Sequence, residues 1–133
     1  MVHPADRRLF DRMLDDLVEQ LPDRLRELME EVPLIVEDEP SDALLDELDM
    51  DPRESDLCGL HWGVPVTERS VQQSGTFPDR MMLFRGPIMR LAGYRARRGD
   101  RNALAQQIRI TLLHEIGHHF GLDEEDLAAL GYG

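Results

Sequence analysis

The chain has 133 residues, of which 41% are hydrophobic and 5% aromatic, and its formal net charge is -12. This length and composition predict one globular domain over residues 1–133 with a single modest core. No apolar run approaches the length of a membrane span, and the N-terminal MVHPADRRLF lacks the apolar stretch of a signal peptide. We therefore expect a cytoplasmic protein with no membrane partner.

Residues 4–31 are predicted to be helical. Apolar residues recur there at spacings of three and four, at Leu9, Phe10, Met13, Leu14, Leu17 and Leu21. Pro22 and Asp23 are expected to interrupt the pattern and to begin a second, short helix through Met29. Residues 33–37 form a β-branched run bounded by proline and acids, which favours a first strand.

Residues 37–56 hold ten acids and one arginine, and we expect an exposed loop or a short helix over 43–48. The D-x-D-x-D-G pattern of a calcium loop is missing from this segment. Residues 1–60 carry 19 acids and 6 arginines, whereas residues 61–122 carry 4 acids and 9 arginines. The simpler interpretation is that the two halves form ion pairs across the fold. The alternative is that the basic half favours an acidic partner near the histidines.

The segment CGLHWGVPVTERS, residues 58–70, is expected to bend at its glycines and to lead into Val64–Thr67. Cys58 is the only cysteine, which excludes an intrachain disulfide and a thiolate metal cluster. Its neighbours are apolar, so we expect it to be a small core residue rather than a nucleophile.

Residues 79–85, DRMMLFR, predict another strand, which Gly86 and Pro87 end. A short helix is expected over 87–93, since proline is tolerated in a first helical turn. Residues 94–101, YRARRGDR, read as a basic loop.

The longest helix is predicted over 102–120, where apolar residues again recur at helical spacing. Gly121 stands where a left-handed C-cap usually ends a helix. A last short helix is expected over 123–130.

This long helix contains H-E-x-x-H. His114 and His118 are four residues apart and share one helix face, so both imidazoles can donate to one Zn²⁺. Glu115 projects in an adjacent direction, from which it can reach a water at the metal and act as general base.

A third protein ligand is needed, and Gly121 lets the chain reverse to supply it. Glu124 stands six residues beyond the second histidine, where H-E-x-x-H-x-x-G-x-x-H proteins place a third ligand. We favour Glu124, with Asp123 as the alternative if the turn is tighter. His119 faces elsewhere and is expected to pack or to support the ligands.

Two further histidines are not assigned to the metal. His61 is expected to be a turn residue beside Trp62, although the fold could bring it near the site. His3 is close to the terminus and is expected to have no role.

Three segments together resemble the small bacterial zincin-like metallopeptidases, which are minimal single-domain zincins. They are LCGLHWGVPVTERS (57–70), PDRMMLFRGPI (78–88) and TLLHEIGHHFGLDEEDL (111–127). The resemblance implies an α+β, zincin-like fold in which a small mixed β-sheet packs on helices and the H-E-x-x-H helix lies near the C-terminus. It further implies that 79–85 is the edge strand beside that helix.

The same resemblance implies His114 and His118 as zinc ligands and Glu115 as general base, and it supports Glu124 as the third ligand. The function so predicted is that of a zinc metallopeptidase acting on a peptide or protein, which would add as a strand against Arg80–Phe84. Tyr132, Arg85 and Arg90 could add substrate contacts, but we expect a frayed terminus for Tyr132 and ordinary surface roles for both arginines.

Two alternatives compete with this function. One is a metal-dependent hydrolase of RNA, but a net charge of -12 disfavours a nucleic-acid partner. The other is an interaction module, with or without metal, whose acidic 37–56 segment contacts a basic partner.

Overall fold

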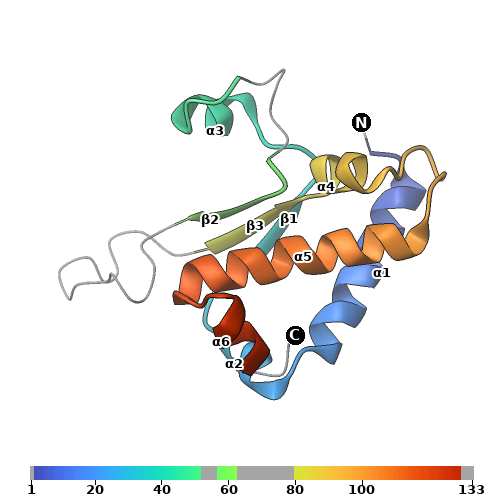
Figure 1. Ribbon diagram of the computed structural model, residues 1–133. Coiled ribbons are helices and arrows are strands. Elements are labelled where there is room, and N and C mark those ends of the chain that lie inside the picture. The colour runs from blue at the N-terminus through green and yellow to red at the C-terminus, as the bar shows by residue number, and fades with distance from the viewer. Residues whose placement is uncertain (1, 52–56, 63–79, 130–133) are drawn as a thin grey trace.

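The structure is a computed structural model that describes residues 2–51, 57–62 and 80–129 (Figure 1). The helices are α1 (Pro4–Gln20), α2 (Asp23–Glu30), α3 (Asp42–Glu47), α4 (Arg85–Ala92), α5 (Arg101–Phe120) and α6 (Glu124–Ala129). The strands are β1 (Leu34–Glu37), β2 (Gly59–Trp62) and β3 (Arg80–Phe84). A three-stranded mixed sheet packed against helices confirms the predicted α+β class. In the described part of the chain, no helix has the length and apolarity to cross a membrane.

Strand β3 is the centre of the sheet, which has the order β1-β3-β2. It pairs in parallel with β1 and antiparallel with β2. The predicted edge position of residues 79–85 is therefore wrong. In the described sheet, β2 is the edge strand that contacts α5. Residues Met81 to Phe84 are all buried, and a continuous apolar run of this kind is typical of a strand covered on both faces.

Strand β2 replaces the bend that the glycines of this segment predict. Leu60 lies opposite Met82 and His61 lies opposite Met81 in its antiparallel ladder with β3. This pairing stabilises extended backbone in spite of the low strand propensity of Gly59. The predicted Val64–Thr67 segment lies outside the described residues, as does Tyr132.

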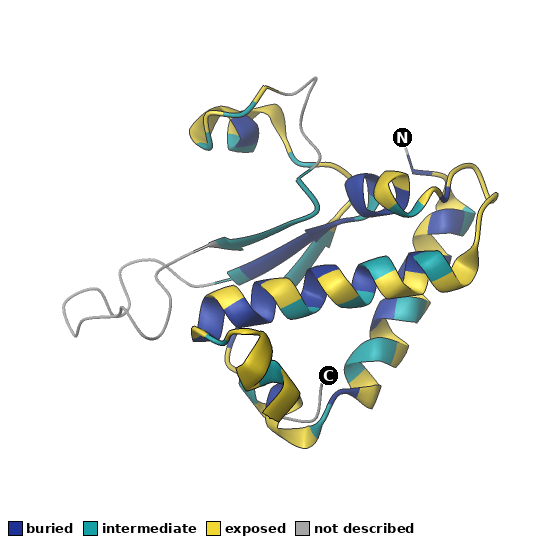
Figure 2. Ribbon diagram, in the orientation of Figure 1, coloured by how far each residue is buried: buried dark blue, intermediate teal, exposed yellow. Residues whose placement is uncertain are grey.

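Helix α5 crosses the sheet and is buried along one side, as the dark stripe in Figure 2 shows. Asp100 caps its start by accepting a hydrogen bond from the Asn102 N–H at 2.8 Å. Helices α1, α2 and α4 and strand β3 meet this stripe in one apolar core, in which Phe10, Leu25, Leu83, Ile88, Leu104, Ile108, Leu112 and Ile116 are fully covered. Half-buried Cys58 packs against the same core, as predicted.

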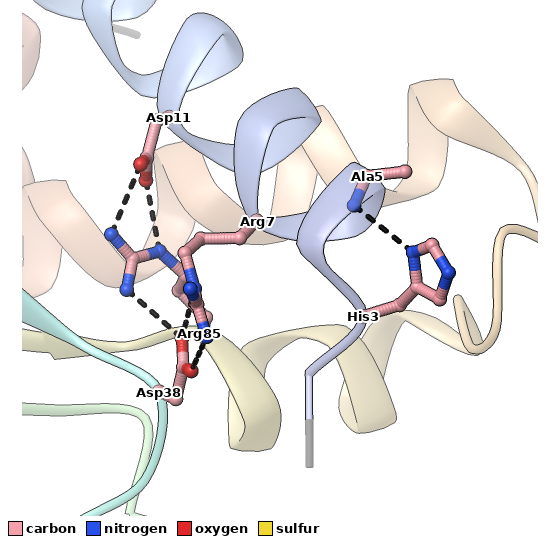
Figure 3. Close-up of polar contacts among 6 residues, drawn as sticks. All are labelled: His3, Ala5, Arg7, Asp11, Asp38 and Arg85. Carbon is pink, nitrogen blue, oxygen red and sulfur yellow. Dashed lines mark hydrogen bonds and ion pairs between the residues drawn. The ribbon is translucent and has the colours of Figure 1, made fainter.

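The start of α1 depends on a histidine for which we predicted no role. The Nδ1 atom of His3 accepts a hydrogen bond from the Ala5 N–H at 3.0 Å (Figure 3). His3 is the N-cap residue, and Pro4 follows it in the first turn, where its missing N–H costs nothing.

An arginine from the basic half of the chain joins two acids of the acidic half. The Arg85 guanidinium donates to both carboxylate oxygens of Asp11 and, at 3.0 Å, to Asp38, which Arg7 also contacts (Figure 3). Although burial opposes it, hydrogen bonds from the two arginines hold the pKa of Asp38 below its ordinary value. Arg90 pairs with Glu39 in the same way. These contacts confirm ion pairing between the two halves, and both Arg85 and Arg90 are committed to it.

We expect Arg85→Ala to lower the free energy of unfolding by about 2 kcal/mol, because it leaves two partly buried carboxylates without their shared cation. The Arg85 side chain is only 12% exposed, whereas Arg24, which pairs with Glu27 on α2, is 65% exposed. Arg24→Ala is the matched control, with an expected loss below about 0.5 kcal/mol. Urea unfolding of both variants measures the difference, and equal losses would contradict a structural role for Arg85.

Candidate metal centre

The last two turns of α5 present two histidines side by side. The ring centroids of His114 and His118 are 4.2 Å apart and the rings are nearly perpendicular. Both residues are exposed, so a metal ion could reach them from solvent. Partial burial and the neighbouring His114 lower the pKa of His118, which favours the neutral imidazole that binds a metal.

Glu115 lies between this helix and β2 and is only 7% exposed. Burial raises the pKa of Glu115 to about 7 from an ordinary value of 4.5. A Cβ atom at Gly59 would come 2.9 Å from the Glu115 Cγ and 3.1 Å from its Oε1. Gly59 therefore leaves the space that the Glu115 side chain fills. The sequence did not reveal this role, because glycine in this segment suggested a bend.

A second contact joins the same two elements one helical turn further along. The Nδ1 atom of His119 lies 2.6 Å from the Nε2 atom of His61, and His119 is 1% exposed. The predicted packing of His119 is confirmed. The predicted turn position of His61 is wrong, because its backbone belongs to β2. On α5, the side chain of His119 is therefore turned toward β2, whereas His114 and His118 are exposed.

The chain reverses after α5 through two glycines. Gly121 has the left-handed backbone, with φ of 66°, that its sequence position predicts. The Leu122 N–H then donates to the Gly117 carbonyl at 2.8 Å. A Cβ atom at Gly117 would lie 2.9 Å from the Leu122 carbonyl oxygen, so only glycine allows this close return. Gly117 was missed as a functional position, although a glycine inside a strong helical pattern is itself a signal of close packing.

The reversal places both candidate third ligands on the cleft that the two histidines line. Asp123 and Glu124 line a cleft of about 650 Å³ together with His114 and His118. Asp123 is engaged in capping α6: its Oδ1 accepts the Asp126 N–H at 2.8 Å, and its own N–H donates to the Asp126 carboxylate at 3.0 Å. In the described residues the Glu124 carboxylate has no comparable bond, which favours Glu124 over Asp123.

The donor types fit zinc, but the set is not assembled. Two imidazoles and a carboxylate form a known catalytic zinc ligand set. Among residues 2–51, 57–62 and 80–129, however, no three histidine, cysteine or acidic side chains converge closely enough to hold a metal ion. Of the predicted ligands, His114 and His118 lie side by side, and Glu124 would have to move toward them to complete the set.

Comparison with known protein families shows which family contains this chain. Residues 29–133 match the model of the zincin-like metallopeptidases. The chain belongs to this family. The match confirms the resemblance and the zincin-like fold drawn from the three sequence segments. No curated protein gives a significant match.

Family membership implies a metal, typically zinc, in this zincin-like metallopeptidase. The match includes all three strands and the helices from α3 to α6. Helix α1 and nearly all of α2 precede it, and α1 packs on α5. The candidate residues on α5, β2 and α6 all lie within the matched segment.

We expect Gly117→Ala to destabilise the fold by about 1–2 kcal/mol, even though alanine is the better helix former. The added methyl group would meet the rigid backbone carbonyl of Leu122, so residues 121–124 must shift. Gln106→Ala, at an exposed position on the same helix, is the control and should change stability little. Urea unfolding measures both, and an unchanged or raised stability of Gly117→Ala would exclude this close packing.

We also expect a pH effect from Glu115 in the metal-free protein. Between pH 4.5 and about 7 the unfolded chain ionises this carboxyl group while the folded chain keeps it neutral. The free energy of unfolding should therefore fall across this interval by on the order of 3 kcal/mol, relative to Glu115→Gln. Urea titrations of both proteins at several pH values measure the difference, and parallel curves would refute the burial effect.

Proposed function

We propose that this chain is a zinc-dependent peptidase with His114, His118 and Glu124 as metal ligands and Glu115 as general base. The observation that carries the proposal is the buried Glu115, whose pKa is near 7, beside two exposed histidines whose rings meet edge to face. Family membership supports the same chemistry.

Glu115 is suited to moving a proton at neutral pH. A general base works best when its pKa lies near the working pH, and burial against β2 gives Glu115 that property. Zinc held by the histidines would supply Lewis acidity that activates water and polarises a carbonyl group. Glu115 can accept the proton from the attacking water and return it to the leaving amine.

Strand β2 is the place where an extended substrate fits this arrangement. Among the described residues β2 pairs on one side only, with β3, while the predicted docking strand β3 has neighbours on both sides. A peptide added to the outer side of β2 would use main-chain hydrogen bonds for affinity. It would then pass close to Glu115, because Gly59 packs directly on that side chain.

The first experiment measures zinc per chain after purification without chelators or a histidine tag. We expect about one zinc ion in the wild type and in Asp123→Asn, and much less in His114→Ala, His118→Ala and Glu124→Ala. Asp123→Asn is the matched control for Glu124, since it removes the neighbouring charge and keeps a capping side chain. Zinc loss in Asp123→Asn but not in Glu124→Ala would exchange the two assignments.

The second experiment tests catalysis by incubating the protein with a mixed peptide library and detecting the products by mass spectrometry. Glu115→Gln should keep its zinc and its fold while cleavage falls by about a hundredfold or more. Zinc binding without any cleavage by the wild type would favour the interaction module. No zinc in the wild type, even after zinc is added, would refute the peptidase.

A further inference from the structure

The connection between α4 and α5 is a tight hairpin turn rich in arginine. Arg95 and Arg98 face each other and exchange two backbone hydrogen bonds of 2.8 and 2.9 Å. The two residues between them, Ala96 and Arg97, have φ of 51° and 65°. Two central residues with positive φ are the mark of a type I′ turn, which normally contains Asn-Gly or Gly-Gly.

This turn is costly in three ways. Ala96 and Arg97 are held in the left-handed region without being glycine. The like charges of Arg95 and Arg98 stand directly opposite each other across the ladder, which is unfavourable. Arg101 adds a further positive charge at the first residue of α5, where the helix dipole favours negative charge.

The turn is nevertheless fixed by specific contacts. The carboxylate of Asp6, which is 4% exposed, accepts a hydrogen bond from the Arg97 N–H at 3.2 Å. At the base of the turn, a Cβ atom at Gly99 would come 2.7 Å from the Gly93 carbonyl oxygen. The fold therefore maintains an unfavourable turn, as proteins do where a local conformation serves binding.

Four arginines of this turn lie at the surface. Arg95, Arg97, Arg98 and Arg101 are all exposed, and in the described part of the chain none forms an ion pair. Arg7, Arg85 and Arg90, by contrast, each bind an acid of the same chain. In a protein with 27 acids and 15 arginines, a cluster of unpaired guanidinium groups is notable.

We propose that the turn formed by residues 95–101 is a docking surface for a short acidic segment of a partner protein. Guanidinium groups bind carboxylates in bidentate geometry, and a short segment can satisfy a patch of this size. A long polyanion such as RNA would extend beyond the patch onto the rest of a chain whose formal net charge is -12. This proposal keeps the acidic partner that the sequence left as an alternative, and it assigns residues 95–101 as its binding surface.

That location is not the one predicted, next to the histidines. Arg101 begins α5 and His114 lies thirteen residues further along, a rise of about 20 Å. Figure 1 shows the turn at one end of α5 and the reversal into α6 at the other. A partner docked on the turn would leave the candidate metal centre accessible.

The test is the binding of a fluorescent octaglutamate peptide, followed by anisotropy at low and high salt. We expect salt-sensitive binding that weakens about tenfold or more in the double variant Arg97→Glu/Arg98→Glu. Arg24→Glu/Arg26→Glu on α2 makes the same change in net charge at another surface and should bind like the wild type. Equal weakening in both variants, or no binding at low salt, would overturn the proposal. Tighter binding of octauridylate RNA at the same turn would overturn it in favour of nucleic acid.

A second variant separates binding from folding. Ala96→Asn/Arg97→Gly installs the residues that a type I′ turn prefers and keeps the backbone N–H that Asp6 binds. We expect a higher midpoint of thermal unfolding together with weaker octaglutamate binding, because a stabilised turn has lost one guanidinium group. A higher midpoint with unchanged binding would exclude Arg97 from the surface.

Discussion

The contact between β2 and the C-terminal half of α5 is the constraint on which the candidate site depends. Gly59 admits the Glu115 side chain, and His61 meets His119 one helical turn further along. These two contacts fix the rotation of α5 about its own axis. Glu115 and His119 face the sheet, and His114 and His118, about 100° away around the helix, lie on its exposed side, whereas Ile116, offset in the other direction, is fully buried.

The same contact explains how the proposed base and the two proposed metal ligands can share a short motif. The exposed imidazoles keep access to solvent and to a metal ion, while the carboxyl group between them in sequence is withdrawn from water. Burial against β2 raises the pKa of Glu115 toward neutrality, whereas partial burial and the neighbouring His114 lower the pKa of His118 on the exposed face. One helix thus provides two environments at adjacent positions.

The sequence predicted those features that local chemistry determines. The long amphipathic helix, its end at Gly121 and the shared face of His114 and His118 follow from helical spacing and capping. The sheet order was not predictable in the same way, because pairing depends on residues distant in sequence. Strand β2 and its contacts with Glu115 and His119 were missed for that reason, since a glycine-containing segment gains its extended form only from its partner β3.

In the proposed ligand set, Glu124 is the residue that can move toward the other two at a low cost in free energy. Helix α6 has six residues and buries none of them, so few contacts resist a shift of Glu124 toward the histidines. Its neighbour Asp123 is held by the reciprocal bonds with Asp126, and Gly117 and Gly121 fix the path of the chain up to that point. Metal binding and the ordering of a weakly packed ligand are coupled in general, because the bonds to the ion supply the free energy that fixes the ligand in place. In the proposed site, the two histidines therefore belong to the long buried helix α5, and the carboxylate of Glu124 lies on a short helix that can shift toward them.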